Sequence, residues 1–251
     1  GQGCLNYMMT RPHDMGGRFG DGPIPIKVKD GKCVDDEPVF KFDWHAKALA
    51  VTLASASVGK WSIDKGRFFR ESLPPFDYNR FSYYEKWISA LVNLLIEKQL
   101  INSEELKNAV DEVTKNNNVL IDKNVIEHKD VLKPKDVSVT LGRGGPSKRE
   151  DLKEPKYKIG DQVKTLNFSP NIYKIGGHTR LPIYARGKQG KIILQHDSHV
   201  LPDKSAHDLG DGQEHLYTVE FTSNELWGII NGNKNDVICI DLWESYLTDD
   251  T

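Results

Sequence analysis

The stretch FSYYEKWISALVNLLI, residues 81–96, decides the character of the first half of the chain. Its apolar side chains recur every three or four residues, at Phe81, Tyr84, Ile88, Leu91 and Leu95. This spacing puts them on one face of an α-helix, which predicts a helix packed against a core. The most apolar part, residues 87–96, is about half as long as the ~20 residues that a membrane-spanning helix needs, so we expect no membrane partner.

The sequence before this stretch carries a second helical stripe, formed by Trp44, Ala48, Leu49, Val51 and Leu53. Pro74-Pro75 separates the two stripes, and Asp77 or Ser82 is expected to cap the longer helix. Asn102 or Ser103, followed by two acidic residues, predicts the start of another helix. We therefore predict a small helical domain over residues 38–114.

The composition changes after the helices. Residues 115–155 are dominated by Lys, Asp, Asn, Gly and Pro, which predicts a polar linker. Short apolar runs between turn residues then predict strands at 157–165, 190–194, 216–221 and 237–242. Residues 156–251 are therefore expected to form a small β-barrel, and the fold class is α+β.

The first 37 residues have little helix or strand period and are punctuated by glycine and proline, which predicts an extended arm. The arm carries several apolar side chains, namely Met8, Met9, Phe19, Ile24 and Ile26. A long apolar segment without its own core gains order from a partner, so we expect residues 1–37 to wrap a partner subunit.

The net charge, the cysteine spacing and the first residues each argue against one class of protein or location. The 251 residues carry a formal net charge of −2, so no basic excess points to nucleic acid. The three cysteines have no Cys-x-x-Cys spacing, so we expect neither a disulfide scaffold nor a thiolate metal site. No basic start followed by an apolar run opens the sequence, and a cytoplasmic location is the expectation.

The sequence offers few catalytic motifs. His196 and His199, with His207 and His215 nearby, form the one local cluster that could hold a metal, but without a Cys or Glu at fixed spacing we expect solvated loop histidines instead. The glycine-rich run at 142–148 lacks the spacing of a phosphate loop, and no Gly-x-Ser-x-Gly motif is present. Nucleophilic catalysis by this chain alone therefore has no support.

Two groups of residues remain without an assigned partner. Arg180 and Arg186 lie in a segment whose glycines and proline fix the backbone, so each guanidinium could bind a defined anion or simply a local carboxylate or solvent. Tyr83 and Trp87, four residues apart, share a helix face that could pack on another helix or form a binding surface.

Several blocks, in the same order, resemble the β subunit of nitrile hydratase. They are His13-Asp14-Met15-Gly16-Gly17, Glu37-Pro38-Val39-Phe40, Asp43-Trp44, Tyr83-Tyr84-Glu85-Lys86-Trp87, Gly177-His178-Thr179-Arg180-Leu181-Pro182, Tyr184-Ala185-Arg186-Gly187-Lys188, Glu225-Leu226-Trp227-Gly228 and Asp241-Leu242-Trp243-Glu244-Ser245-Tyr246-Leu247. The resemblance implies that the barrel is SH3-like and that the chain works with an α subunit as an αβ heterodimer, often doubled to α2β2. It also implies that the α subunit, not this chain, holds cobalt(III) or iron(III) in a cysteine claw with two oxidised cysteines. The expected reaction is hydration of a small nitrile to the amide.

The resemblance also implies site residues. Arg67 and Arg180 match the two arginines that bind the oxidised cysteines, and a planar fork of donors suits sulfinate or sulfenate oxygens. Tyr83 is similar to a pocket tyrosine that contacts the claw and the substrate. Leu49, Leu53 and Trp87 are similar to the apolar wall of the nitrile pocket, and Trp87 with Leu49 favours cobalt over iron. The alternatives are a thiocyanate hydrolase-like member or a non-catalytic activator that delivers the metal.

Overall fold

The computed structural model describes residues 38–116, 128–151, 153–167, 171–232 and 235–249, and the backbone of two short strands within residues 1–37. These strands, β1 (Val28–Lys29) and β2 (Lys32–Cys33), pair antiparallel. The rest of the predicted arm lies outside the described residues. The chain divides into two compact units, which we call the helical unit and the sheet unit and describe separately.

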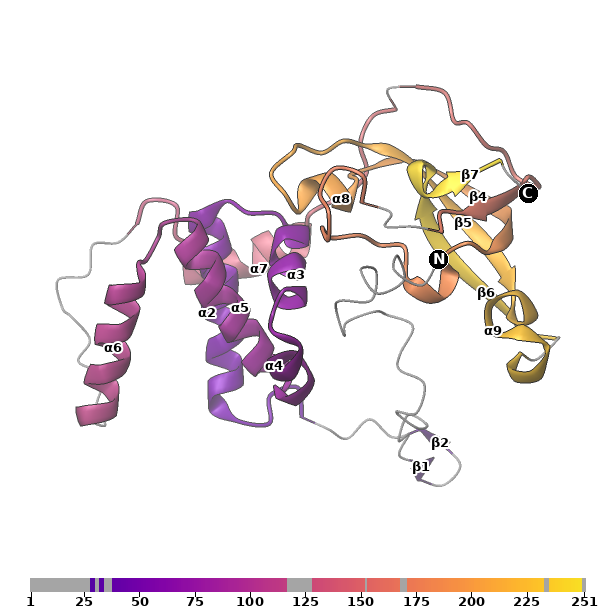
Figure 1. Cartoon of the computed structure of the whole chain (residues 1–251). Helices are drawn as coiled ribbons and strands as arrows, with labels where there is room; N and C mark the ends of the chain where they lie inside the picture. Colours follow the sequence, from indigo (N-terminus) through magenta and orange to yellow (C-terminus); the bar gives the residue numbers. More distant parts are fainter. Residues whose placement is uncertain are drawn as a thin grey trace. The chain divides into compact units, whose positions relative to one another are not determined.

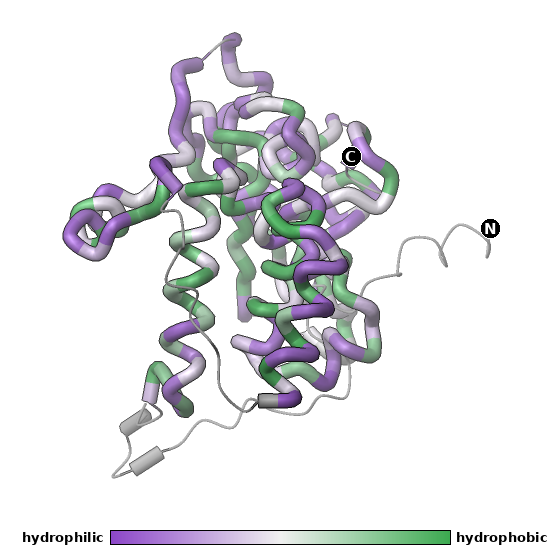
Figure 2. Tube along the Cα trace, turned by 90° about the vertical axis from the view of Figure 1, so that its left-hand side faces the viewer, coloured by the Kyte–Doolittle hydropathy of each residue, from purple (hydrophilic) through white to green (hydrophobic). Residues whose placement is uncertain are grey.

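The helical unit includes, of the described residues, 38–62, 72–116 and 128–144. Its helices are α2 (Asp43–Gly59), α4 (Pro75–Arg80), α5 (Tyr83–Glu97), α6 (Ser103–Asn116) and α7 (Pro134–Arg143). Helices α2 and α5 pack side by side (Figure 1). Hydrophobic and hydrophilic stretches alternate along the helical trace (Figure 2), as expected for helices with one buried face.

Side-chain caps fix where two of these helices begin. Ser82 and Glu85 form a capping box at the start of α5, and the Ser82 amide donates to Glu85 Oε2 at 2.7 Å. At the start of α6, Asn102 Oδ1 accepts hydrogen bonds from the amides of Glu104 and Glu105 at 3.0 and 2.9 Å. Of the paired candidates in the sequence, Ser82 and Asn102 are therefore the caps.

The predicted polar linker contains helix α7, which the composition did not indicate. Pro134 stands in the first turn, where its missing N–H and fixed φ are compatible with a helix start. The apolar side chains of this helix stay largely exposed, with Val139 and Leu141 about half accessible. A short helix with so little burial gives only a weak sequence signal.

The sheet unit is built on one antiparallel sheet with the strand order β6-β5-β4-β3-β7. Its strands are β3 (Gln162–Thr165), β4 (Gln189–His199), β5 (Glu214–Thr222), β6 (Val237–Trp243) and β7 (Leu247–Thr248). Register shifts against β5 interrupt β4 after Ile192 and after Gln195, and such bulges bend a strand. Four strands overlap the segments predicted from the sequence, although β4, β5 and β6 extend beyond them, so the fold is mixed helix and sheet as expected.

The core of the sheet unit is formed mainly by buried side chains of these strands, together with Tyr246 just before β7. The fully buried ones include Val163, Ile192, Tyr217, Val219, Phe221, Leu242 and Tyr246. Short helices flank the strands, namely α8 (Pro202–Ser205), α9 (Ser223–Asn231) and the 3-10 turns η1 (Ile183–Ala185) and η2 (Glu244–Tyr246).

Helix α3 (Ile63–Glu71) belongs to the sheet unit, although residues 38–114 were predicted as one helical domain. Lys65, which is 4% exposed, forms an ion pair with Asp208 at 2.5 Å. The ring of Phe68 meets the ring of His207 edge-on at a centroid distance of 4.5 Å. These contacts join residues more than a hundred positions apart in the sequence, and no local pattern encodes them.

Candidate functional site

The two predicted arginines both lie in the sheet unit. Arg67 projects from α3, and its Nη1 donates to Asp64 Oδ1 at 2.8 Å, one helical turn earlier. The Arg67 side chain remains 38% exposed, so part of its donor fork stays available. Arg180 lies in the segment between Asn171 and η1 and is partly buried.

His178 connects the helix of Arg67 to the segment of Arg180. Its Nδ1 lies 2.7 Å from Glu71 Oε2, and its Nε2 lies 3.9 Å from Asp64 Oδ1. The His178 side chain is 1% exposed, and in such low-dielectric surroundings its hydrogen bond to Glu71 is stronger than it would be in water. The hydrogen bond between His178 and Glu71 therefore joins α3 to the backbone two residues before Arg180.

The backbone before Arg180 is held tightly. The His178 amide donates to His207 Nε2 at 3.0 Å, and the His178 carbonyl accepts from Asn171 Nδ2 at 2.6 Å. A Cβ on Gly177 would lie 2.6 Å from Asn171 Nδ2, 2.7 Å from His207 Nε2 and 2.8 Å from the Lys174 carbonyl. Position 177 therefore needs glycine because its surroundings approach the backbone too closely for a side chain.

The backbone of Arg180 is anchored from the core side. Its amide donates to Tyr246 Oη at 3.1 Å, and the Tyr246 hydroxyl donates to Asp203 Oδ1. Burial raises the pKa of Asp203 from 3.8 to about 6, against the lowering effect of the hydrogen bond from Tyr246. Burial and the neighbouring Asp203 carboxylate also hold the pKa of Tyr246 well above its usual value.

Arg186 has a local partner of a different kind. Its Nε and Nη2 donate to the Leu181 carbonyl at 3.3 and 3.2 Å. The sequence did not indicate this backbone carbonyl, five residues away, as a partner. Arg186 closes the turn that follows Arg180.

The other four predicted residues lie in the helical unit. Tyr83, at the first turn of α5, is 63% exposed, and its ring lies 5.5 Å from that of Trp87 one turn later. Trp87 is half-buried, as are Leu49 and Leu53 on α2. Tyr84 is buried instead, with its ring 4.7 Å from that of His45 and 5.1 Å from that of the exposed Tyr83.

Three histidines of the cluster lie in strands rather than in the expected loop, whereas His207 lies in a turn after α8. His196 and His199 are part of strand β4, where His196 contacts Thr218 Oγ1 at 2.8 Å and His199 contacts Ser147 Oγ at 3.0 Å. His215 is buried, and its Nε2 lies 2.6 Å from the Lys153 carbonyl. Across the described parts of the chain, no group of three or more His, Cys, Asp or Glu side chains is arranged to hold a metal ion.

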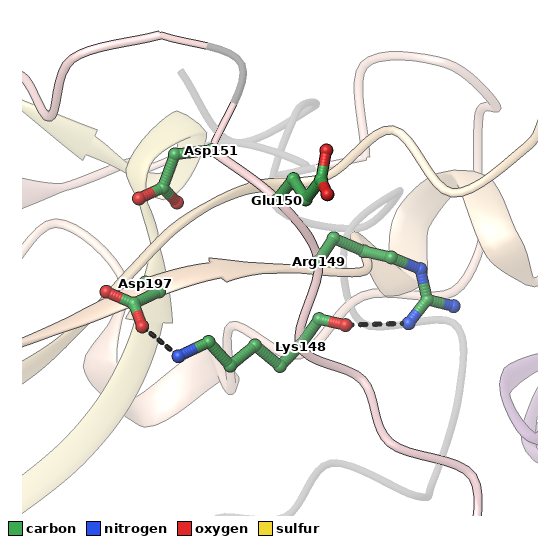
Figure 3. Close-up of a pocket in the computed structure, with 5 residues that line it drawn as sticks. All are labelled: Lys148, Arg149, Glu150, Asp151 and Asp197. Atoms are coloured by element: carbon green, nitrogen blue, oxygen red, sulfur yellow. Dashed lines mark hydrogen bonds and ion pairs between the residues drawn. The ribbon is translucent and has the colours of Figure 1, made fainter.

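An open pocket lies elsewhere in the sheet unit and is lined by Lys148, Arg149, Glu150, Asp151 and Asp197 (Figure 3). Lys148 is paired with Asp197, and Arg149 Nε donates to Asp211 at 2.6 Å. The predicted site residues are not in its lining. Its cations already have carboxylate partners, so it does not offer a free charged site.

Comparison with known families decides the identity. The family model described as "Nitrile hydratase beta subunit, N-terminal" matches residues 9–137, and "Nitrile hydratase beta subunit, C-terminal" matches residues 146–249. The chain belongs to the nitrile hydratase β-subunit family.

Within the described residues, no helix has the length and apolar character to cross a membrane.

Relatives in the nitrile hydratase family match over nearly the whole chain. The beta subunit of the low-molecular weight cobalt-containing nitrile hydratase of Rhodococcus rhodochrous is 35% identical over 94% of this chain and 97% of its own length. The beta subunit of the cobalt-containing enzyme of Pseudonocardia thermophila is 34% identical over 95% and 96%. A solved thiocyanate hydrolase of Thiobacillus thioparus covers 50% of this chain and 98% of its own at 22% identity, with a TM-score of 0.36, too low to guide function.

The sequence did not single out four residues around the arginines, namely Asp64, Glu71, Asp203 and Tyr246. His178 and Tyr246 stand in quoted motifs, but the motifs give no partner for either. Glu71 and His178 are separated by 107 positions, and Asp203 and Tyr246 by 43. Only packing reveals such pairs, because their sequence spacing follows no helix or strand period.

Proposed function

We propose that this chain is the β subunit of an αβ nitrile hydratase and completes the site at which a nitrile is hydrated to the corresponding amide. The observation that carries the proposal is the match of both nitrile hydratase β-subunit models, which together span residues 9–249 with a short gap. The match over the C-terminal half also favours a catalytic β subunit over an activator that corresponds to the helical half alone.

In this proposal Arg67 and Arg180 donate to the oxidised cysteine oxygens of the α subunit. Arg67 is supported by its half-exposed fork, which one carboxylate holds in place without consuming all its donors. Arg180 is supported by the fixed backbone from which it projects. Arginine suits this role because two parallel N–H groups can bind one oxyanion in a defined orientation.

The helical unit is proposed to supply the substrate pocket. Leu49, Leu53 and Trp87 would line an apolar sleeve for the nitrile, and Tyr83 would contact the claw and the substrate. Their support is that these side chains are only half-buried or, for Tyr83, exposed, although the first three are strongly apolar. Such a surface is able to orient a small rod-shaped ligand whose one polar atom points elsewhere.

The cofactor is proposed to be cobalt(III), held by the α subunit, rather than iron(III). Two relatives are named as cobalt-containing, which supports the metal type. The described residues of this chain bring together no donor set that fits a metal ion. In this proposal the metal and its Lewis-acid chemistry belong to the α subunit, as the family resemblance implies, and this chain supplies donors and pocket shape.

The assembly is proposed as αβ, doubled to α2β2 or larger, with residues 1–37 as an arm on the α subunit. We propose four parts: the arm, a helical domain at 38–114 whose helix α3 groups with the sheet unit, a polar linker at 115–155 that contains α7, and an SH3-like barrel at 156–251. The return of the last strand, β7, to the first strand, β3, supports this arrangement, although β6 and β7 remain the two edges of the sheet in the described residues. A reducing, cytoplasmic location is supported by the free and exposed thiol of Cys239.

The test is the Arg180→Lys variant, made in the αβ complex. Lysine keeps the charge but loses the fork, and each lost charge-assisted hydrogen bond is worth about 1.5–3 kcal/mol, so turnover should collapse while the complex still assembles and holds metal. Arg186→Lys is the matched control, because Arg186 lies in the same segment but binds the Leu181 carbonyl. Nitrile hydration and metal content are measured together, and wild-type turnover in Arg180→Lys would refute the role.

A further inference from the structure

We propose that Tyr246, backed by Asp203, is the positioning residue that sets where the Arg180 guanidinium points. This inference rests on the proposed function, because it concerns how the β chain presents Arg180 to the partner. Tyr246 does not contact substrate in this scheme. It acts through the backbone of Arg180.

The geometry of the anchor is specific. Tyr246 Oη accepts the Arg180 amide proton at 3.1 Å and donates its own proton to Asp203 Oδ1, so a single hydroxyl joins the arginine backbone to a buried carboxylate. Tyr246 is fully buried and Asp203 is 1% exposed. The Asp203 carbonyl is in turn bound by Asn171 Nδ2 at 3.1 Å, and the same nitrogen binds the His178 carbonyl. Positions 171, 178, 180, 203 and 246 thus form one connected frame.

The Arg180 amide lies outside any helix or strand, so regular secondary structure gives it no hydrogen-bond acceptor. Its acceptor is the Tyr246 hydroxyl, through which the frame holds the Arg180 backbone. Without the phenol oxygen, this N–H would lose its acceptor in a partly buried segment, and the segment would shift to satisfy it. A shift of the Cα moves the base of a long side chain, and an error of about 1 Å at a reacting group can cost about 100-fold in rate.

Burying Tyr246 and Asp203 as a polar pair is energetically less favourable than filling the same space with apolar side chains. Burial opposes the ionisation of Asp203, as its raised pKa indicates. Apolar side chains of similar size would pack in the same place without burying a charge. The polar pair has this energetic disadvantage, and in exchange it provides a fixed acceptor for the Arg180 amide, which is what a positioning role requires.

The experiment compares Tyr246→Phe with Tyr217→Phe in the purified αβ complex. Tyr217 is the matched control because it is equally buried in the same unit and its hydroxyl also donates to a carboxylate, Glu244 Oε2, at 2.8 Å, while the amide that it accepts from is that of Tyr157 and not that of Arg180. Both variants lose one buried hydroxyl. Hydrogen exchange of the peptide that contains residue 180 is measured by mass spectrometry, together with kcat and KM for a small nitrile.

We expect Tyr246→Phe to increase exchange at residue 180 and to lower kcat about tenfold or more with KM changed less than about twofold, and Tyr217→Phe to do neither. Equal behaviour of the two variants, or faster exchange with an unchanged kcat, would overturn the inference. Should Tyr246→Phe fail to assemble, Asp203→Ala and Asp203→Asn decide, because only asparagine keeps an acceptor for the Tyr246 hydroxyl. Exchange at residue 180 should then rise more in the alanine variant, and equal exchange in both overturns the inference.

The two proposals fail in different ways. A wild-type complex that hydrates no nitrile would remove the proposed function, whereas the exchange comparison still reports whether Tyr246 holds Arg180. An active wild type with matched Tyr246 and Tyr217 variants would remove only the positioning role.

Discussion

Replacing Asp203 by asparagine should remove one source of pH dependence from the stability of this chain. Asp203 is 1% exposed, and burial raises its pKa from 3.8 to about 6. Because the folded protein holds the proton more tightly than the unfolded chain, the carboxyl costs no stability below about pH 4. The cost grows as the pH rises towards 6 and is complete above it.

The magnitude follows from the size of the shift. A shift of about two pKa units corresponds to roughly 3 kcal/mol at pH 7, and to about half of that at pH 5, where the folded carboxyl is still mostly protonated. Since asparagine does not ionise, the free energy of unfolding of wild type should fall by about 1 kcal/mol relative to Asp203→Asn between pH 5 and pH 7. A constant offset from the altered hydrogen bond to Tyr246 does not affect this difference.

The assay is urea unfolding of the αβ complex at one protein concentration and several pH values, with the partner's contribution cancelling between variants. Asp236→Asn is the matched control, because Asp236 is exposed and its substitution relieves no buried carboxylate. Parallel stability curves for wild type and Asp203→Asn from pH 5 to 7 would refute the reasoning that burial dominates at Asp203.

Three further predictions concern the pocket, the arginine segment and the helical unit. Trp87→Ala should change the ranking of nitriles by about 1–3 kcal/mol in kcat/KM, because pocket volume acts on fit; a uniform loss across small and aromatic nitriles would mean that Trp87 is only core. Gly177→Ala should lower the thermal unfolding temperature of the complex, because the new Cβ would meet Asn171 and His207 below 3 Å; an unchanged unfolding temperature contradicts the close packing. Ser82→Ala should cost about 1 kcal/mol in urea unfolding through loss of the capping box, and a neutral effect contradicts that cap.

The sequence alone determined the local features. Apolar spacing over 81–96 is enough to predict α5 and its buried face, and the candidates for its cap are limited to Asp77 and Ser82. Alternating apolar residues between turns located the strands in the same way. Each of these signals lies within a few residues, where backbone geometry alone relates side chains to one another.

The family motifs predicted two site arginines and the residues of a substrate pocket, but they did not indicate which side chains surround the arginines. Only the tertiary structure groups α3 with the sheet unit, places His178 beside Glu71, and puts Tyr246 and Asp203 beneath Arg180. These partners come from distant parts of the chain, and the pairing of each depends on how whole elements pack. A buried hydrogen-bonding group must find its partner wherever the fold brings one, and no sequence period records that position.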